Sequence, residues 1–186
     1  MQYDHIIIDG RHALFRVAST MASLGFIKVC LSIVERHGHA GTRLTICWEG
    51  GWLHRRKMYP DYKRNRVKRK DVAASPLLIT LNDQEAILKG ILSLAGWEQA
   101  WCEGYEADDV MSTLAAGART PTAIYTGDHD LHQCVTDYVH VLSPNNTRKR
   151  KGGGDTIRWD NAAVRERWKV DPLRVPDVKG LEGDTS

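Results

Sequence analysis

The sequence has no long hydrophobic run, few cysteines and no sign of an export signal. No apolar stretch in its 186 residues approaches the roughly 18 residues that a transmembrane helix needs. Residues 1–4 lead directly into the β-branched run at 6–8, without the basic start, apolar centre and cleavage site of a signal peptide. The four cysteines are widely spaced and form no Cys-x-x-Cys pair. These absences argue against a membrane protein, a disulfide framework or a zinc knuckle, and we expect a cytoplasmic protein with reduced thiols.

The histidines also lack the spacing of metal ligands. None of the eight is paired with a cysteine or with another histidine on a helix: His129 lies in a turn, and His37 and His39 flank a glycine. A histidine-based metal site is therefore disfavoured, and we assign these side chains to packing or to the surface. A hydrophobic content of 42% with 26% charged residues is ordinary for one globular domain, or for one domain and part of a second.

The net charge is small, but positive charge is concentrated in one segment. The net charge is only +3, yet residues 55–70 hold nine Lys and Arg against the single acid Asp61, which gives this segment +8 and the rest of the chain −5. A shorter basic run follows at 148–151. Aromatic side chains accompany the first run at Trp52, Tyr59 and Tyr62. A solvated surface is the alternative interpretation, but cations with aromatic rings are typical of single-stranded nucleic acid binding.

Short apolar strands alternate with amphipathic helices along the chain. The sequence predicts strands at 5–8, 43–48, 97–101, 122–126 and 138–142. It predicts helices at 13–36 with an interruption at Gly25, at 82–95 capped by Asn82, at 106–116, after the cap Asp160, and at 176–181. In the second of these helices, the buried stripe is expected to comprise Ile87, Leu88, Ile91 and Leu92. This alternation predicts an α/β fold of three layers, with a mostly parallel central sheet covered by helices on both faces.

Carboxylates follow three of the predicted strands. Asp9 comes directly after the first strand, Glu49 after the second, and Asp128 and Asp130 after the fourth. Because parallel sheets bind ligands beyond the carboxyl ends of their strands, we expect these acids to lie at one edge. Three further acids open a predicted helix: Glu106, Asp108 and Asp109. Each acid alone has an ordinary explanation as a turn residue or helix-dipole partner, but together they predict a shared acidic centre.

Seven carboxylates at one edge would repel one another unless cations neutralised them. Oxygen ligands without cysteine or an essential histidine suit Mg²⁺ or Mn²⁺. Two such ions about 4 Å apart are the usual apparatus for in-line attack on a phosphodiester, since they activate a water and stabilise the attacking and leaving oxygens. The basic segment would then hold a polyanionic substrate against this centre. The residues therefore predict two-metal hydrolysis of a phosphodiester.

Five motifs carry a resemblance to a known family. They are IIIDG at 6–10, YPDYKRNR at 59–66, EGYEADDV at 103–110, YTGDHDL at 125–131 and VKGLEGDTS at 178–186. In this order they resemble the 5′-nuclease family, which includes the flap endonucleases and the 5′–3′ exonuclease domain of bacterial DNA polymerase I. The resemblance implies a PIN-like core that hydrolyses DNA at 5′ flaps, 5′ ends or single strands near a junction, as in primer removal during replication. It also implies a monomer in a bacterial or phage-infected cell, with no membrane partner.

The resemblance assigns roles to individual residues. Metal ligands, direct or through water, would be Asp9, Glu49, Glu106, Asp108, Asp109, Asp128, Asp130 and Asp184. Lys63 would polarise the phosphate with Arg66 beside it, and Tyr62 would stack on a base near the scissile bond. The other cations of the basic segment would bind the DNA backbone: Arg55, Arg56, Arg64, Lys68, Arg69 and Lys70. The implied cofactors are two Mg²⁺ or Mn²⁺ ions.

The sequence departs from the family pattern at two places. Glu49 stands where an Asp is usual, which can change the metal geometry. The chain also ends inside the last Gly-Asp motif, which the family continues with another acid and a helical DNA-binding element that holds a monovalent cation. We interpret the chain as a piece of a longer protein, with a reduced relative as the alternative. The expected division is a nuclease core at 1–158 with an arch-like basic segment at 52–78, followed by the start of the helical element at 159–186.

Three other functions fit parts of the pattern. A DNA-binding relative that no longer cuts would explain Glu49 and the absent final acid. A PIN-like ribonuclease shares the arrangement of acids but usually lacks the basic block. A haloacid-dehalogenase-like phosphatase also places Asp-Gly after its first strand, but it requires a second Asp two residues after the first, where this chain has Arg11. The phosphatase is therefore the weakest alternative.

Overall fold

The central layer of the protein is a sheet whose strands are mostly parallel. The computed structural model describes residues 1–17, 22–64, 76–145 and 156–183, and of residues 76–80 only the backbone. Within this part, six strands have the order β3-β2-β1-β4-β5-β6, and β6 alone runs antiparallel to its neighbour. The strands are β1 His5–Asp9, β2 Arg43–Cys47, β3 Glu98–Ala100, β4 Thr122–Tyr125, β5 Val139–Pro144 and β6 Thr156–Trp159. The predicted mostly parallel sheet is confirmed.

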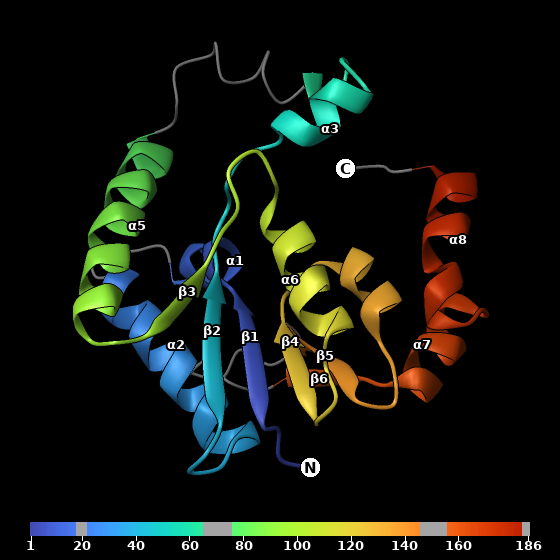
Figure 1. Cartoon of the computed structure of the whole chain (residues 1–186), viewed down its shortest axis with the longest axis horizontal. Helices are drawn as coiled ribbons and strands as arrows, with labels where there is room; N and C mark the ends of the chain where they lie inside the picture. Colours follow the sequence, from blue (N-terminus) through green and yellow to red (C-terminus); the bar gives the residue numbers. More distant parts are fainter. Residues whose placement is uncertain (18–21, 65–75, 146–155, 184–186) are drawn as a thin grey trace.

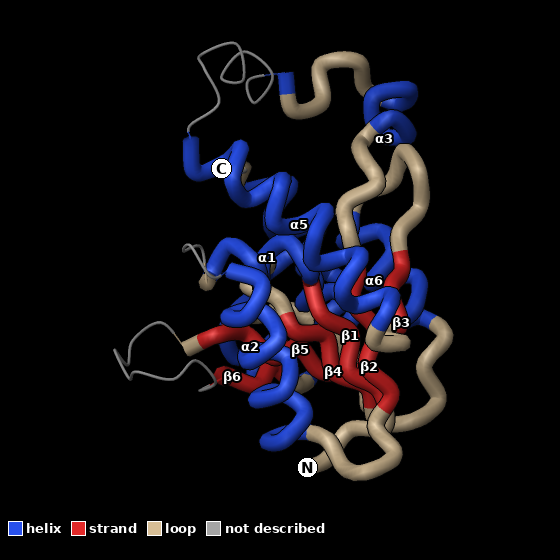
Figure 2. The backbone as a smooth tube through the Cα atoms, turned by 90° about the vertical axis from the view of Figure 1, so that its left-hand side faces the viewer, coloured by secondary structure: helices blue, strands red, loops and turns tan. Residues whose placement is uncertain are grey.

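Helices cover both faces of this sheet (Figures 1 and 2). One face is covered by α1 Gly10–Arg16, α2 Ala22–His37 and α5 Pro76–Leu94. The other is covered by α6 Ala107–Ala116, α7 Asn161–Trp168, α8 Val175–Glu182 and the 3-10 helices η1 His129–Cys134 and η2 Pro172–Arg174. The short helix α3 Leu53–Met58 stands beyond the carboxyl end of β2 (Figure 1). The structure therefore has the three layers that the sequence predicts.

The β-branched run of β1 explains why the sheet has a core on each side. Ile6 and Ile8 pack against α1, α2 and α5, whereas Ile7 packs in the second core beside α6. All three are fully buried, as expected for a central parallel strand whose alternate side chains point to opposite faces. Val164 and Val175 of α7 and α8 belong to the same second core, so the described residues after 156 pack onto the sheet.

The register of the strands brings the acids of the sequence to one edge. Asp9 pairs with Cys47 across β1 and β2, and Ile8 pairs with Tyr125 across β1 and β4. Glu49 and the turn that starts at Gly127 therefore leave the sheet beside Asp9. The predicted convergence of strand ends is a direct consequence of this parallel pairing.

The first predicted helix is divided at a different place from the one expected. α1 ends at Arg16 and α2 begins at Ala22, while Gly25 lies inside α2. A Cβ at Gly25 would lie 2.9 Å from the Cβ of Val17, so the glycine allows close packing between the two helices. The prediction that Gly25 interrupts the helix was therefore wrong. The glycine continues the helix, and its lack of a side chain allows the close contact.

The helix predicted at 82–95 begins earlier and buries fewer side chains than expected. α5 starts at Pro76, so Asn82 lies inside the helix and is not its cap; its side-chain oxygen accepts a hydrogen bond from Arg11 at 3.1 Å. Leu88 and Leu92 are buried as predicted, whereas Ile87 and Ile91 are exposed. Proline is well suited to a first helical turn, which explains the earlier start. Of the predicted arch-like segment 52–78, residues 65–75 lie outside the described residues.

The antiparallel strand β6 was not predicted. Thr156–Trp159 pairs with Val141–Pro144 of β5 and extends the sheet at its edge. The prediction that Asp160 caps the following helix is confirmed, since its side chain accepts the N–H of Ala163 at 3.0 Å. None of the helices in the described ranges is long and apolar enough to span a bilayer.

Candidate active site at the carboxyl edge of the sheet

Asp9 joins β1 to α1 and is held on both sides. Its Oδ1 accepts the backbone N–H of His12 at 2.9 Å as the N-cap of α1, and its Oδ2 accepts the hydroxyl of Thr126 at 2.9 Å. The residue is buried. Burial raises the pKa of Asp9, and the hydrogen bond from His12 opposes this shift. The carboxylate is therefore fixed in place at the carboxyl edge of the sheet.

Glu49 follows β2 and reaches the start of α6. Its Oε2 accepts the backbone N–H of Ala107 at 3.4 Å, while its Oε1 is buried without a hydrogen-bond partner. Burial raises the pKa of Glu49, and the neighbouring carboxylate of Glu106 adds to the increase. A buried oxygen without a donor costs roughly 1–3 kcal/mol, so this atom is a natural ligand for a cation or a water.

Glu106 and Asp109 form the N-terminal cap of α6 and anchor the basic segment. Asp109 Oδ2 accepts the backbone N–H of Glu106 at 3.1 Å, in a capping-box arrangement. Glu106 is almost fully buried and accepts the Tyr62 hydroxyl at 2.6 Å and the ammonium of Lys63. Arg55 lies 3.2 Å from Glu106 through Nε and 2.8 Å from Asp109 through Nη2. The cations predicted to bind substrate are thus in direct contact with acids predicted to bind metal.

Asp128 and Asp130 come from the turn after β4. Asp128 caps η1, with its Oδ1 accepting the backbone N–H of Asp130 at 2.8 Å. The backbone N–H of Asp128 itself donates to the Thr126 hydroxyl at 3.1 Å. Asp130 forms an ion pair with Lys179 of α8. Thr126 therefore connects this turn to Asp9, because its hydroxyl is shared between them.

Asp108, in the first turn of α6, lies among the other predicted acids. It lines a cavity of about 620 Å³ together with the other six described acids predicted as ligands: Asp9, Glu49, Glu106, Asp109, Asp128 and Asp130. Burial, followed by the charges of Asp128 and Asp9, raises the pKa of Asp108 to about 7. The predicted acidic centre is therefore a single cavity whose charges destabilise one another.

The donors of this cavity fit hard divalent cations. Seven carboxylates, the unpartnered Oε1 of Glu49 and the raised pKa of Asp108 all indicate negative charge that a cation would stabilise. Among the described residues, however, no three His, Cys, Asp or Glu side chains lie close enough to form a ready coordination shell. Three of the carboxylates are instead held by the cations Arg55, Lys63 and Lys179. A coordination shell therefore requires some of these side chains to change partners.

The predicted substrate-binding residues fall into three groups. Arg55, Tyr62 and Lys63 face the acidic cavity. Arg56 lies over the ring of Trp52, at 5.3 Å from its centre, and the exposed Arg64 pairs with Asp61 at 2.9 Å. The other predicted substrate-binding residues, and the predicted metal ligand Asp184, lie outside the described part of the chain: Arg66, Lys68, Arg69 and Lys70.

The cavity also contains residues that the sequence did not single out. Arg11, His12, Gln133 and Lys179 line it. Burial lowers the pKa of His12, and its Nε2 has no hydrogen-bond partner. Arg11 and His12 directly follow the IIIDG motif and Lys179 lies within VKGLEGDTS, so their positions next to motif acids were an available signal. Gln133 carried no such signal.

Curated relatives match most of this chain but extend beyond it. A 5′-3′ exonuclease of Streptomyces coelicolor is 36% identical over 169 residues, which cover 86% of this chain and 54% of the relative. A 5′-3′ exonuclease of Aquifex aeolicus is 31% identical over 169 residues, covering 89% and 52%. DNA polymerase I of Mycobacterium bovis is 36% identical over 172 residues, covering 90% of this chain and 17% of the polymerase. The chain therefore spans about half the length of these two exonucleases.

Solved structures share the fold. The T5 D15 protein crystallised with metal ions superposes with a TM-score of 0.75 at 19% identity, over 97% of this chain and 66% of that one. The bacteriophage T5 D15 flap endonuclease in a complex with DNA and metal ions gives a TM-score of 0.71 at 20% identity, with the same coverage. At this identity the likeness establishes the fold alone.

A family match covers most of the residues that build the cavity. Residues 4–169 match the family described as 5′-3′ exonuclease, N-terminal resolvase-like domain. The matched range contains β1 to β6 and all seven acids that line the cavity. The chain belongs to the 5′-3′ exonuclease family, through its N-terminal resolvase-like domain.

Proposed function

We propose that the protein is a divalent-metal-dependent 5′ nuclease that hydrolyses DNA phosphodiesters at 5′ ends or flaps. The observation that carries the proposal is the cavity itself, in which seven carboxylates from three strand ends and one helix start meet the cationic residues of α3 and its following turn. Few other chemistries require so much like charge in one place. Relatives named 5′-3′ exonuclease, and structural neighbours determined with DNA and metal ions, support it.

The carboxylates would hold two Mg²⁺ or Mn²⁺ ions. When bound, such ions supply an activated water and stabilise charge on the attacking and leaving oxygens. Among the described acids of the cavity, Asp9, Glu49, Asp108 and Asp128 form no ion pair with its cations, and they are therefore the first ligands we assign. Glu49 offers its unpartnered Oε1. The other acids, Glu106, Asp109, Asp130 and the undescribed Asp184, would complete the set directly or through water.

The cations beside the acids would bind the scissile phosphate. Lys63 and Arg55 hold Glu106 and Asp109, and these contacts are available for exchange when a phosphate and metal enter together. The pKa of Tyr62 is raised by burial and by its hydrogen bond to Glu106, so it remains a hydroxyl donor. Donors aimed at the phosphate stabilise the charge that develops during hydrolysis. Arg66 would act with Lys63, and Arg56, Arg64, Lys68, Arg69 and Lys70 would bind the DNA backbone.

Further parts of the proposal concern the whole protein. We expect a monomer that acts on unpaired DNA near a junction, in a bacterial or phage-infected cell. The division into a core at 1–158 and a helical element that starts at 159 remains a proposal, as does the binding of a monovalent cation.

The test is Mg²⁺-dependent cleavage of a labelled 5′-flap DNA. The protein should cut the flap with Mg²⁺ and stop when EDTA is added. Asp128→Asn should abolish cleavage while leaving DNA binding in EDTA largely intact, because the side-chain oxygen that caps η1 remains. Asp137→Asn, at an acid that bonds Asn161 away from the cavity, serves as the control. Cleavage by Asp128→Asn at the unmutated rate would remove Asp128 from the metal site.

One observation favours a second candidate, a DNA-binding relative that does not cut. Glu106, Asp109 and Asp130 are occupied by protein cations, and no ready coordination shell exists among the described residues. Binding of flap DNA without turnover in Mg²⁺ or Mn²⁺ would support this candidate. The same assay with a single-stranded RNA of equal sequence distinguishes a ribonuclease.

A further inference from the structure

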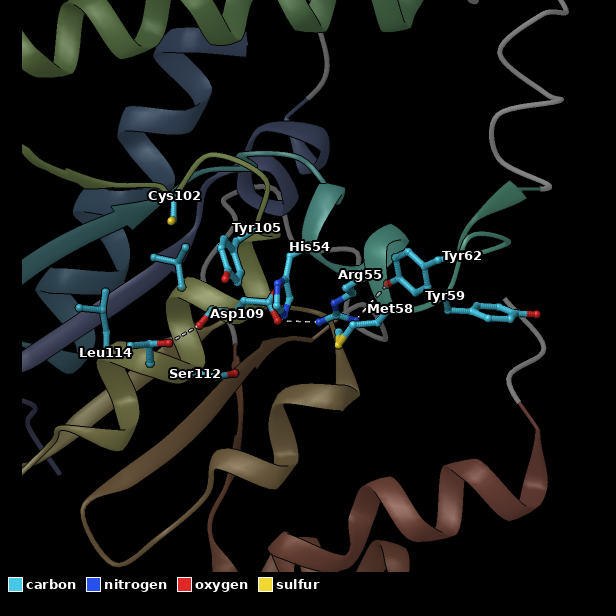
Figure 3. A pocket seen from close by; sticks show the side chains of 12 residues that line it. His54, Arg55, Met58, Tyr59, Tyr62, Cys102, Tyr105, Asp109, Ser112 and Leu114 are labelled. Carbon is cyan, nitrogen blue, oxygen red and sulfur yellow. Dashed lines mark hydrogen bonds and ion pairs between the residues drawn. The ribbon is translucent and has the colours of Figure 1, made fainter.

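A second, largely apolar cavity lies beside the acidic one, between α3 and α6 (Figure 3). Its volume is about 930 Å³, which is in the range of ligand-binding cavities. Apolar side chains of Met58, Val110 and Leu114 line it together with the aromatic rings of Tyr62 and Tyr105. None of the residues that line only this cavity has a part in the metal chemistry proposed above.

The two cavities share a wall. Arg55, Tyr62, Asp109 and Ser112 line both of them. Arg55 is central to this wall, because it donates to the Tyr62 hydroxyl at 3.0 Å and to Asp109 at 2.8 Å (Figure 3). A strand with its scissile phosphate in the acidic cavity therefore has a neighbouring nucleotide within reach of the apolar one.

A pair of stacked rings forms a flat platform in the apolar cavity. The rings of His54 and Tyr105 lie 4.6 Å apart at an angle of 20° (Figure 3). The backbone fixes their supports: the N–H of His54 donates to the carbonyl of Gly104 at 3.0 Å, and the N–H of Gly50 donates to the carbonyl of Tyr105 at 3.0 Å. A Cβ at Gly50 would lie 1.9 Å from the carbonyl oxygen of Cys102, so only glycine permits this approach. The platform is therefore formed before any ligand binds, which lowers the entropic cost of binding.

The surroundings of the platform indicate what it binds. The adjoining helix α3 carries Arg55, Arg56 and Lys57 and no acid. Single-stranded nucleic acid binds where phosphates meet cations and bases stack on aromatic rings. An apolar protein segment would use the cavity without the cationic rim or the continuity with the acidic cavity. A base of an unpaired strand uses all three features.

We propose that this cavity binds one nucleobase of the unpaired DNA strand, next to the nucleotide at the scissile phosphate, by stacking on the Tyr105–His54 pair. The proposal rests on the proposed function in that it assumes a DNA strand in the acidic cavity. Stacking is tolerant of base identity, because every base has a flat π face. The site would therefore position any sequence for cleavage without selecting one.

The test uses a set of 5′-flap DNAs, each with one abasic position near the cleavage point. Affinity is measured in EDTA with the full chain, so that cleavage does not interfere. Loss of the base should weaken binding by roughly 10-fold at one position next to the scissile phosphate or one nucleotide beyond it. Tyr105→Ala should bind intact DNA about 10-fold more weakly and be indifferent to the abasic position. Tyr105→Phe, which keeps the ring, should behave as the unmutated protein.

Tyr138→Ala is the matched control, since Tyr138 is also an exposed tyrosine but lies at the amino end of β5. The proposal would be overturned if no abasic position weakened binding, or if the abasic position weakened binding of Tyr105→Ala as much as that of the unmutated protein. Cleavage of the same DNAs in Mg²⁺ tests the proposed function separately. A protein that cuts but shows no base-dependent position lacks this site, whereas one that binds with the expected pattern but never cuts keeps the site and loses the nuclease function.

Discussion

At the amino half of the sheet, imidazoles pair with hydroxyl groups, whereas at the carboxyl edge carboxylates pair with cations and crowd one another. His5 bonds Thr45 at 2.8 Å and Tyr3 bonds His140 at 3.1 Å, while Glu98, which accepts the Thr45 hydroxyl at 2.9 Å, is paired with Arg43. At the other edge, Glu49 keeps an oxygen without a partner, and the charged form of Asp108 is destabilised by burial and by neighbouring acids. Local conflict of this kind is expected at functional sites and unexpected elsewhere. The difference supports the proposal that the carboxyl edge is the site of the chemistry.

The largest expected effect is on activity, through Asp9→Asn. The variant keeps the side-chain oxygen that caps α1 but loses the charge, so it should fold and lose cleavage by a factor on the order of 10²–10³. Asp160→Asn is the matched control, because Asp160 caps α7 in the same way outside the cavity. Flap cleavage rates in Mg²⁺ compare the two. Equal losses in both variants would mean that capping, and not the acidic cavity, explains the defect.

Metal binding should remove the conflict at the carboxyl edge. A divalent ion at 100 times its dissociation constant adds about 2.7 kcal/mol to the free energy of unfolding, or roughly 5–10 °C in Tm for a chain of this size. Thermal unfolding with Mg²⁺, and then with excess EDTA, measures this. Na⁺ at equal ionic strength is the control. The shift should be much smaller in Asp9→Asn, and an equal shift there would place the ions elsewhere.

The sequence was sufficient to predict the parallel strands of the sheet and the edge where the acids meet. Buried β-branched strands such as Ile6–Ile8 have a strong local signature, and parallel pairing then determines where Asp9 and Glu49 leave the sheet. The helix starts at Glu106 and Asp160 were also predictable, because capping depends on residues close in sequence.

Features that depend on distant contacts could not be predicted in the same way. Gly25 was interpreted as a break, but in the structure it makes room for Val17, the residue that follows α1. The ion pair of Lys179 with Asp130 joins residues 49 positions apart, and β6 forms only because β5 offers an edge. The apolar cavity beside the acidic one arises from α3 and α6 together, so no single segment indicated it.

A smaller effect is expected on stability, through Asp108→Asn. The raised pKa of about 7 means that the folded protein binds more protons than the unfolded chain between pH 4 and 7, so stability falls as pH rises through this range. Removing the charge should therefore raise the free energy of unfolding at neutral pH, by on the order of 2 kcal/mol without metal. Urea unfolding in EDTA measures it. Asp177→Asn, an exposed acid in the first turn of α8, is the control and should change little.

The smallest effect is expected at the amino half, with the opposite dependence on pH. Burial lowers the pKa of His140 below 6.5, so the unfolded chain binds more protons there and stability falls as pH decreases below this value. His140→Gln should flatten this decline by less than about 1 kcal/mol, because water still screens part of the region. Urea unfolding from pH 7.5 to 5 measures this decline. The control is His54→Gln, because His54 is exposed. If His140→Gln left the decline unchanged, neutral pairing at this half would not explain its tolerance of buried polar groups.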